Sequence, residues 1–555
     1  MEAVVLAVGA VAAVFGATAL AKKTRIGAPL LLLALGMGVS LLPFVPEIEV
    51  EPEWILAGVL PPLLYSAAVR TPVVDLRRNL AVIGGLSVVL VLITAVLAGL
   101  AIHAVFPRVP LHVAIALGAV LSPTDAAATA IVKRAGAPAR VATVLDGEAL
   151  LNDATSLVTL RTAIAGAATF FGALGDFLWA VGVAGAVGLA VGWVCLRLAG
   201  RIDDPVLHTL FSFLVPFAAY LPVEWLGSSG LASVVAAGLV MGHGAHRFDS
   251  ARNRLAQRAN WQTVEVLAEG AVFLAMGLQV FALYQAFQRE NDSVAGALLT
   301  ALVALAVVLA VRGVVVTALL GVLGRGRGRA GRGGDAERGT GQDSPPNPEA
   351  ARLGWREGVA LEWAGLRGVV TLAAAQTLPL DTPERPALAL IAFAVAAGSL
   401  LLQGLTLRPL LRRLGLTEGD PAALAAWRTK LRRRAAGVAR RYLDGLGGPD
   451  GATAGTASGA GAASGPGTRY SGAALELARS TAPWVTVPDL DDPPPAGAHP
   501  SPKATERAEL RELRLAAVRA MRRDLLAGDA WAAYPSRVLA EALEDLDQEE
   551  LAIDL

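Results

Sequence analysis

The chain has 555 residues, of which 54% are hydrophobic and only 17% are charged, and its formal net charge is +1. This composition excludes an ordinary soluble protein, because a soluble chain of this length is less apolar and carries more charge. A single cysteine, Cys195, excludes an internal disulfide and a thiolate metal site. The apolar residues come in blocks of about 17–25, the length with which a helix crosses a bilayer. We therefore predict an all-α polytopic membrane protein.

Thirteen apolar blocks are candidate transmembrane helices. The first begins with "MEAVVLAVGA", which lacks the basic start of a secretory signal, so we expect it to be a span as well. The blocks cover approximately residues 3–20, 26–44, 54–69, 79–106, 111–133, 141–170, 174–199, 205–222, 226–242, 260–285, 295–323, 355–379 and 386–411.

The basic residues of the loops are distributed unevenly. Most follow odd-numbered blocks, whereas the loops after even-numbered blocks carry only Arg108, Arg289 and Arg385. By the positive-inside rule, this asymmetry predicts an N-terminus outside the cell and a C-terminus in the cytoplasm.

Beyond the last block the sequence becomes polar. Residues 1–415 are predicted to form the transmembrane domain, and 416–446 a basic juxtamembrane helix. Residues 447–503, rich in Gly, Ala, Ser and Pro, are typical of a flexible linker, and 504–555 have the pattern of a charged, cytoplasmic helical tail.

Six ionisable side chains of the apolar blocks fall in one slab near the predicted midplane, where each costs several kcal/mol and indicates a function. At about 1.5 Å per residue, all six lie roughly 10–18 Å from the predicted cytoplasmic boundary. They are Asp125, Glu148, Asp153, Glu269, Arg312 and Arg367. We interpret Asp125 and Asp153 as an ion pocket and the two arginines as structural counter-charges. For Glu148 and Glu269, a structural ion pair and a role at the ion site both remain open.

The backbone is predicted to break at two of these charges. Pro123 in "SPTD" cannot donate a backbone hydrogen bond, so the fifth block is predicted to kink or unwind there. The twelfth block is interrupted by glycines in "WAGLRGVV", and the two blocks cross the membrane in opposite directions. Interrupted helices at corresponding places in two halves predict an inverted repeat with an ion site at its centre.

Carboxylates in such a pocket suit Na⁺ or K⁺ and also accept a proton. A carboxylate that holds either a cation or a proton, but not both, couples the two flows by competition. A gated cation channel is a rival hypothesis, although no repeated pore-loop signature occurs. An intramembrane aspartyl protease also uses two buried aspartates, but arginines at the same depth do not fit one, so we do not expect an enzyme.

Two other motifs are similar to a metal site and to an RNA-binding tract, but we interpret both as loops. "HGAHR" at 243–247 has a histidine spacing that suits a metal, but we predict a plain basic loop. "GRGRGRAGRGG" at 324–334 is similar to RNA-binding tracts, yet between two spans it is predicted to be a flexible loop, so no nucleic-acid partner is expected.

With these motifs the chain resembles the monovalent cation:proton antiporter-1 family, in its bacterial sodium/proton exchanger (NhaP-type) branch. The resemblance covers about residues 1–415 and rests on "LSPTDAAATAIVK", "LDGEALLNDATSLV", "SSGLASVVAAGLVMG", "AVFLAMGLQV", "GLRGVVTLAAA" and "SLLLQGLTLRPLLRRLGL", in the family's order. It implies thirteen spans, six-helix core bundles, a dimerisation domain and elevator-like alternating access. It also implies a plasma-membrane homodimer that transports monovalent cations and protons without a cofactor.

The resemblance also assigns roles to residues. Thr124, Asp125 and Asp153 are expected to bind the cation. Asn152, held by Glu148, marks the electroneutral branch, whose members exchange one cation for one proton.

Arg312 and Arg367 match two membrane arginines that brace the family's core. The chain departs from the family at Ala126, usually Pro, and at Ala149, usually Ser. We therefore expect an electroneutral sodium/proton antiporter, with potassium/proton exchange as the alternative.

Overall fold

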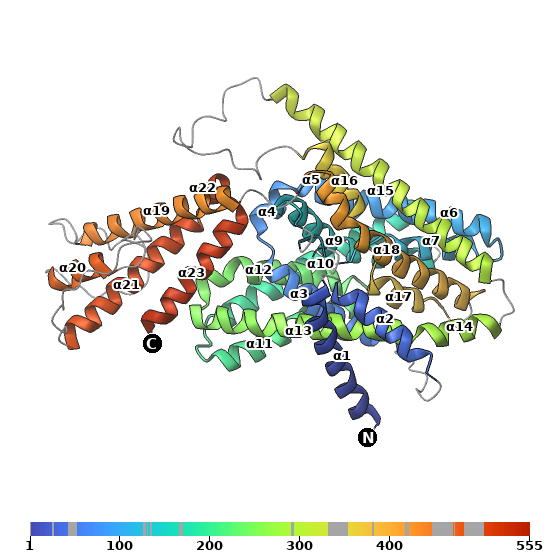
Figure 1. Ribbon diagram of the computed structural model, residues 1–555, viewed down its shortest axis with the longest axis horizontal. Coiled ribbons are helices and arrows are strands. Elements are labelled where there is room, and N and C mark those ends of the chain that lie inside the picture. The colour runs from blue at the N-terminus through green and yellow to red at the C-terminus, as the bar shows by residue number, and fades with distance from the viewer. Residues whose placement is uncertain are drawn as a thin grey trace. The chain divides into compact units, whose positions relative to one another are not determined.

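The computed structural model describes residues 2–24, 27–42, 51, 53–125, 129, 131–133, 136–165, 170–289, 294–330, 353–379, 382–416, 421–446, 470, 472–481 and 504–554. Within these ranges every regular element is a helix, which confirms the all-α prediction (Figure 1). The chain divides into two compact units. One comprises Met1–Gly333 and Arg352–Glu418, and the other Gly334–Ala351 and Gly419–Leu555.

Helices of the first unit overlap every predicted apolar block. They are α1 (Glu2–Thr24), α2 (Ala28–Ser40), the π-helix η1 (Trp54–Val59), α3 (Leu60–Arg70), α4 (Val73–Arg78), α5 (Leu80–Gly84), the π-helix η2 (Gly85–Val89), α6 (Leu90–Val105), α7 (Leu111–Leu121), α9 (Ala139–Ile164), α10 (Phe170–Ala199), α11 (Pro205–Trp225), α12 (Gly230–Phe248), α13 (Ala251–Leu278), α14 (Val280–Arg289), α15 (Val294–Ala330), α16 (Trp355–Trp363), α17 (Val369–Gln376) and α18 (Arg385–Arg413). Seven helices in the described ranges are long and apolar enough to cross a membrane, and shorter apolar helices accompany them.

Two predicted loops are partly helical instead. Residues 243–247 belong to α12, which runs to Phe248, so the plain loop predicted there is wrong. His246 and Arg247 extend the helix because basic side chains in a last turn interact favourably with its dipole. Likewise, the backbone of α15 stays helical through Ala330, into the tract predicted to be flexible, although Gly324, Gly326 and Gly328 disfavour a helix.

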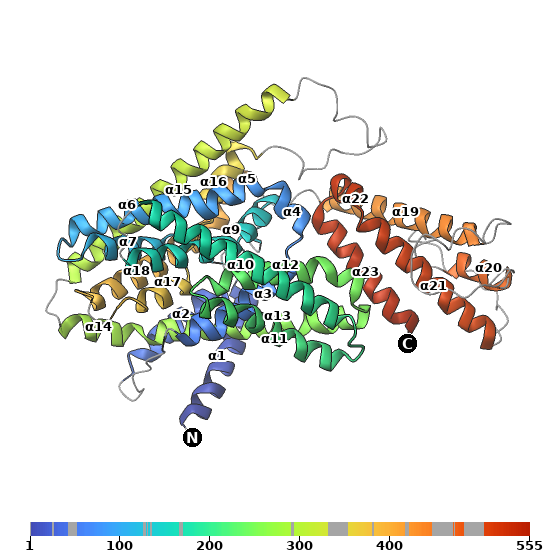
Figure 2. The same ribbon diagram turned by 180° about the vertical axis from the view of Figure 1, so that it is seen from behind.

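The helices of the first unit pack in two groups. The first helix group consists of α1, α2, α3, α10, α11, α12 and α13, and the second of α4, α5, α6, α7, α9, α15, α16, α17 and α18, while α14 contacts α18 of the second group and α2 of the first. Helix α9 of the second group also packs against α3, α10 and α12, so it lies along the boundary between them (Figure 2).

Glycines let helices within each group approach closely. A Cβ on Gly118 of α7 would lie 2.2 Å from the carbonyl oxygen of Ala95 in α6. A Cβ on Gly277 of α13 would lie 2.5 Å from the carbonyl oxygen of Leu33 in α2. Close backbone packing of this kind replaces the hydrophobic driving force that lipid does not provide.

The second unit contains α19 (Pro421–Leu446), α20 (Gly472–Thr481), α21 (Ala504–Leu525), α22 (Gly528–Ala533) and α23 (Ser536–Asp554). Helix α20 lies inside the predicted linker and packs on α21, because Ala474, Leu475 and Ala478 form a buried face. The linker residues on either side of α20 lie outside the described ranges, apart from Tyr470.

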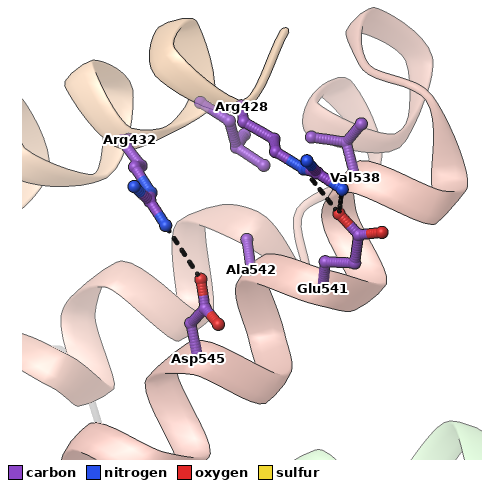
Figure 3. A pocket seen from close by; sticks show the side chains of 7 residues that line it. Arg428, Arg432, Val538, Glu541, Ala542 and Asp545 are labelled. Carbon is purple, nitrogen blue, oxygen red and sulfur yellow. Dashed lines mark hydrogen bonds and ion pairs between the residues drawn. The ribbon is translucent and has the colours of Figure 1, made fainter. Parts of the chain in front are cut away.

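Arginines of α19 face carboxylates of α23 across a groove of about 270 Å³ (Figure 3). Arg428 lies 2.8 Å from Glu541, and Arg432 lies 3.5 Å from Asp545. Beneath the groove, leucines of both helices are buried, so charge pairs rim an apolar contact. Both pairs are accessible to solvent, and they therefore respond to salt and pH.

The pH dependence of the Glu541 pair has a definite sign. Burial alone raises the pKa of Glu541, but hydrogen bonds from Arg428 and Arg537 outweigh it and lower the pKa below its usual 4.5. Folding thus stabilises the ionised form, and this contribution is present above pH 4.5 and lost as pH falls through the lowered pKa. We expect Glu541→Gln to speed amide hydrogen exchange in α19 and α23 at neutral pH.

The difference from the unsubstituted chain should shrink as pH falls below 4.5 and through the lowered pKa of Glu541. Glu549→Gln on the same helix is the control, since the described residues provide Glu549 with no ion pair. Equal effects of the two substitutions would contradict the assignment.

Candidate functional site

The two interrupted helices meet at residues 122–125 and 364–368. Helix α7 ends at Leu121, and the chain is not helical from Pro123 to Asp125, as "SPTD" predicts. Helices α16 and α17 are likewise separated by non-helical backbone. The backbone N–H of Asp125 donates a 2.9 Å hydrogen bond to the carbonyl oxygen of Leu366, so the two breaks are joined directly.

Gly368 makes room for the side chain of Asp125. A Cβ built on Gly368 would lie 1.4 Å from Oδ2 of Asp125, so the side chain of Asp125 could not stay in its place if residue 368 had a Cβ. The carboxylate therefore lies directly on the glycine that begins α17. This explains one of the glycines in "GLRGVV".

Arg367 holds the break in place. Its guanidinium donates to the carbonyl oxygens of Leu121 (3.2 Å) and Ser122 (3.5 Å), and it also donates to Gly365. The backbone N–H of Arg367 donates to the hydroxyl of Ser399 at 3.0 Å. A helix end leaves carbonyl groups without partners, and the fully buried Arg367 supplies partners where α7 stops.

Glu148 and Arg312 form a bidentate ion pair that is almost completely buried. Nη1 of Arg312 donates to Oε1 of Glu148, and Nη2 donates to Oε2 at 2.8 Å. The guanidinium also donates to the carbonyl oxygens of Leu361 (2.9 Å) and Glu362 (3.2 Å), the last turn of α16. Gly365 leaves space for it, since a Cβ there would lie 2.3 Å from Nε of Arg312.

Thr124 and Asn152 connect this ion pair to the broken helix. The hydroxyl of Thr124 donates to Oε1 of Glu148 at 3.2 Å and accepts from Nδ2 of Asn152 at 2.8 Å. Asn152 is thus linked to Glu148 through Thr124. Its buried Oδ1 has no hydrogen-bond partner in the described part of the chain.

Asp153 lies one residue further along α9 and is 4% exposed. Its chain neighbour Asn152 is hydrogen-bonded to Thr124, the chain neighbour of Asp125, so the two acids flank one contact between α9 and the break. Among the residues that the structure describes, none donates a hydrogen bond to Asp153, and Arg312 already pairs with Glu148. A buried carboxylate beside a half-buried one is an arrangement whose negative charge a bound cation or a proton lowers.

The remaining predicted residues lie as follows. Ala149 is buried on α9, one turn before Asp153. Ala126 lies outside the described ranges. Glu269 is half-buried on α13, where the adjacent Gly270 packs against Val14 of α1, so it belongs to the first helix group and takes no part in the contacts above.

Several polar groups around the site were not identified from the sequence. Ser399 donates to Gln403 at 2.6 Å, and Gln403 donates to the carbonyl oxygen of Trp363 at 3.0 Å. Ser156 donates to the carbonyl oxygen of Ala119 at 2.8 Å. The available signal is a pair of polar residues four apart in an apolar block, which places Ser399 and Gln403 on one helix face.

Known proteins are similar to the chain in sequence and in fold. A family model described as "Sodium/hydrogen exchanger, transmembrane" matches residues 10–413. An uncharacterized Na⁺/H⁺ exchanger of Mycobacterium bovis is 33% identical over 426 residues, 75% of each chain. The Na⁺/H⁺ antiporter NhaH of Halobacillus dabanensis is 30% identical over 405 residues, 70% of this chain and 91% of that protein.

A solved structure agrees at the level of the fold. The sodium proton antiporter MjNhaP1 from Methanocaldococcus jannaschii at pH 8 matches with a TM-score of 0.56 and 20% identity, over 75% of this chain and 99% of that one. The family model covers most of the chain, and it confirms the resemblance inferred from the motifs. The chain belongs to the sodium/hydrogen exchanger family.

Proposed function

We propose that the chain exchanges Na⁺ for H⁺ at Asp125 and Asp153. The observation that carries the proposal is the contact between the segments that bear them: Asn152, next to Asp153, donates to the hydroxyl of Thr124, next to Asp125, where the interrupted helices meet. Glu148 contributes differently, because its charge is already balanced by Arg312. The names of the relatives, which include Na⁺/H⁺ antiporters, support the same chemistry.

Competition at the two carboxylates couples the flows. With Na⁺ bound between two ionised acids, the pocket carries a charge of −1. With Na⁺ gone and one proton bound, it again carries −1. Alternating access of a site with equal charge in both states moves no net charge, so we propose one-for-one, electroneutral exchange.

Neighbouring groups are proposed to complete the site. The carbonyl oxygens freed at the break, the hydroxyl of Thr124 and the buried Oδ1 of Asn152 are hard oxygen donors that suit Na⁺. Potassium is the alternative cation. Ala149, one turn from Asp153, stands where the family usually has Ser, so this chain lacks a hydroxyl that would affect the choice between Na⁺ and K⁺.

The proposal extends to the oligomeric state, the membrane and the orientation of the chain. The chain is a transporter, and we propose that it needs no cofactor and works as a homodimer in the plasma membrane. The distribution of Lys and Arg supports an external N-terminus and a cytoplasmic tail. Residues 1–415 would carry transport, followed by the juxtamembrane helix, linker and tail.

Transport by proteoliposomes tests the assignment. Internal pH is followed after pulses of Na⁺, Li⁺ or K⁺. We expect Na⁺ to change internal pH, and Asp125→Asn and Asp153→Asn to abolish the response, because an amide neither releases a proton nor balances a cation. An imposed membrane potential should leave the rate unchanged.

Transport that survives in Asp153→Asn would refute the site. A response to K⁺ alone would select the alternative cation, and acceleration by the potential would refute electroneutrality.

A single methyl group tests the position of Asp125. Gly368→Ala places a Cβ where the carboxylate lies, so we expect at least a tenfold loss of transport. The matched control is Gly398→Ala on α18, where a Cβ meets only Leu305 at an ordinary 3.7 Å. Unimpaired exchange in Gly368→Ala would show that Asp125 does not need this position.

Stability separates the structural ion pair from the transport site. Arg312→Met leaves Glu148 buried without a counter-charge, and we expect it to cost about 3–5 kcal/mol of folding free energy. The double variant Arg312→Met, Glu148→Met removes both charges and should recover much of that loss. Thermal unfolding in detergent measures both, and a double variant no more stable than the single one would contradict the pairing.

A further inference from the structure

An ion pair joins the site-bearing helix to the other helix group. Nη2 of Arg161, near the end of α9, lies 2.8 Å from Oε2 of Glu224 in α11, and Nη1 donates to the carbonyl oxygen of Ser228 at 3.1 Å. Oε1 of Glu224 accepts the N–H of Gly230, the first residue of α12, at 3.0 Å. The hydroxyl of Ser228 donates to the carbonyl oxygen of Ala180 in α10. One guanidinium is thus held by a turn that is itself fixed to three helices of the first group.

The position of Arg161 relates this contact to the site. Arg161 follows Asp153 by eight residues on the same helix, which corresponds to about 12 Å along its axis. Helix α9 belongs to the second group, whereas α10, α11 and α12 belong to the first. The contact therefore crosses the boundary between the groups at one end of the helix that carries Glu148, Asn152 and Asp153.

We propose that the Arg161–Glu224 contact is a latch that closes the site at the end of α9 and opens once in every transport cycle. This inference rests on the proposed exchange function, since alternating access requires contacts that exist on one side only while the other side is open. The partial exposure of the pair fits a reversible latch. Arg161 is 50% exposed and Glu224 is 22% exposed, so water takes over their hydrogen bonds when they separate, and a pair of this kind contributes only about 0–1 kcal/mol.

The first helix group offers a matched control. Arg70 of α3 and Glu265 of α13 form an ion pair of similar exposure, 42% and 30%. Both helices belong to the first group and pack on each other. A cross-link between these two positions joins two helices of the same group, so it does not restrain movement of one group against the other.

Reversible cross-linking tests the proposal. The starting chain is Cys195→Ala, which removes the single cysteine. Into it are placed Arg161→Cys with Glu224→Cys, or the control pair Arg70→Cys with Glu265→Cys. A membrane-permeant bis-methanethiosulfonate joins each pair in proteoliposomes, and Na⁺-driven pH change is measured before linking, after linking and after reduction.

We expect linking at 161 and 224 to reduce transport at least tenfold, with recovery on reduction, and linking at 70 and 265 to leave it within twofold. Full transport in the linked 161–224 protein overturns the latch while leaving the exchange function intact. If Cys195→Ala and the unsubstituted chain both fail to exchange Na⁺ for H⁺, the proposed function itself fails.

Charge exchange gives an independent readout. Arg161→Glu places two acids together and should change the transport rate several-fold, while Arg161→Glu with Glu224→Arg restores the pair and should recover most of the rate. Recovery in the double variant supports the latch. Equal rates in the single and double variants overturn it, because the pair then has no part in the cycle.

Discussion

Burial of charge in a medium of low polarity is the constraint on which this structure depends. A lone carboxylate at the depth of α9 is expensive, and Glu148 is balanced by Arg312 in a bidentate pair whose remaining donors bond the end of α16. Once that pair is formed, both arginines near the site are engaged with fixed partners. Asp125 and Asp153 follow Thr124 and Asn152, which are hydrogen-bonded beside that pair, and in the proposed exchange these two acids hold the cation or the proton.

The breaks in α7 and between α16 and α17 follow from the same constraint. Backbone groups without partners are as costly in an apolar environment as charges are. Arg367 bonds the carbonyl groups at the end of α7, and Ser399 and Leu366 complete the set. In the described residues, hydrogen bonds therefore hold the ends of the interruption to the core.

Much of this arrangement was predictable from the sequence, and the reasons are local. Pro123 lacks a backbone donor and so favours a helix end, although Pro216 and Pro222 lie inside α11. Charges inside apolar blocks are recognisable because their burial is costly. The partners were not predictable in the same way. Glu148 and Arg312 are 164 residues apart, and nothing in the spacing indicates that Arg312, rather than Arg367, reaches the acid. Arg161 lies inside the sixth apolar block, and its partner Glu224 is 63 residues away, so the spacing does not reveal this pair. The helical end of α12 was missed because a His- and Arg-rich segment has the composition of a loop, whereas helix ends favour the same residues.

The bonding around the breaks has a mechanical consequence. The hydrogen bonds and ion pairs that hold Asp125, Glu148, Arg312 and Arg367 all run between members of the second helix group. None of those contacts has to be exchanged for another if that group shifts as a rigid body against the first. Under the proposed exchange, the pocket would therefore keep its geometry while the second helix group moves, and only the side of the membrane that it faces would change.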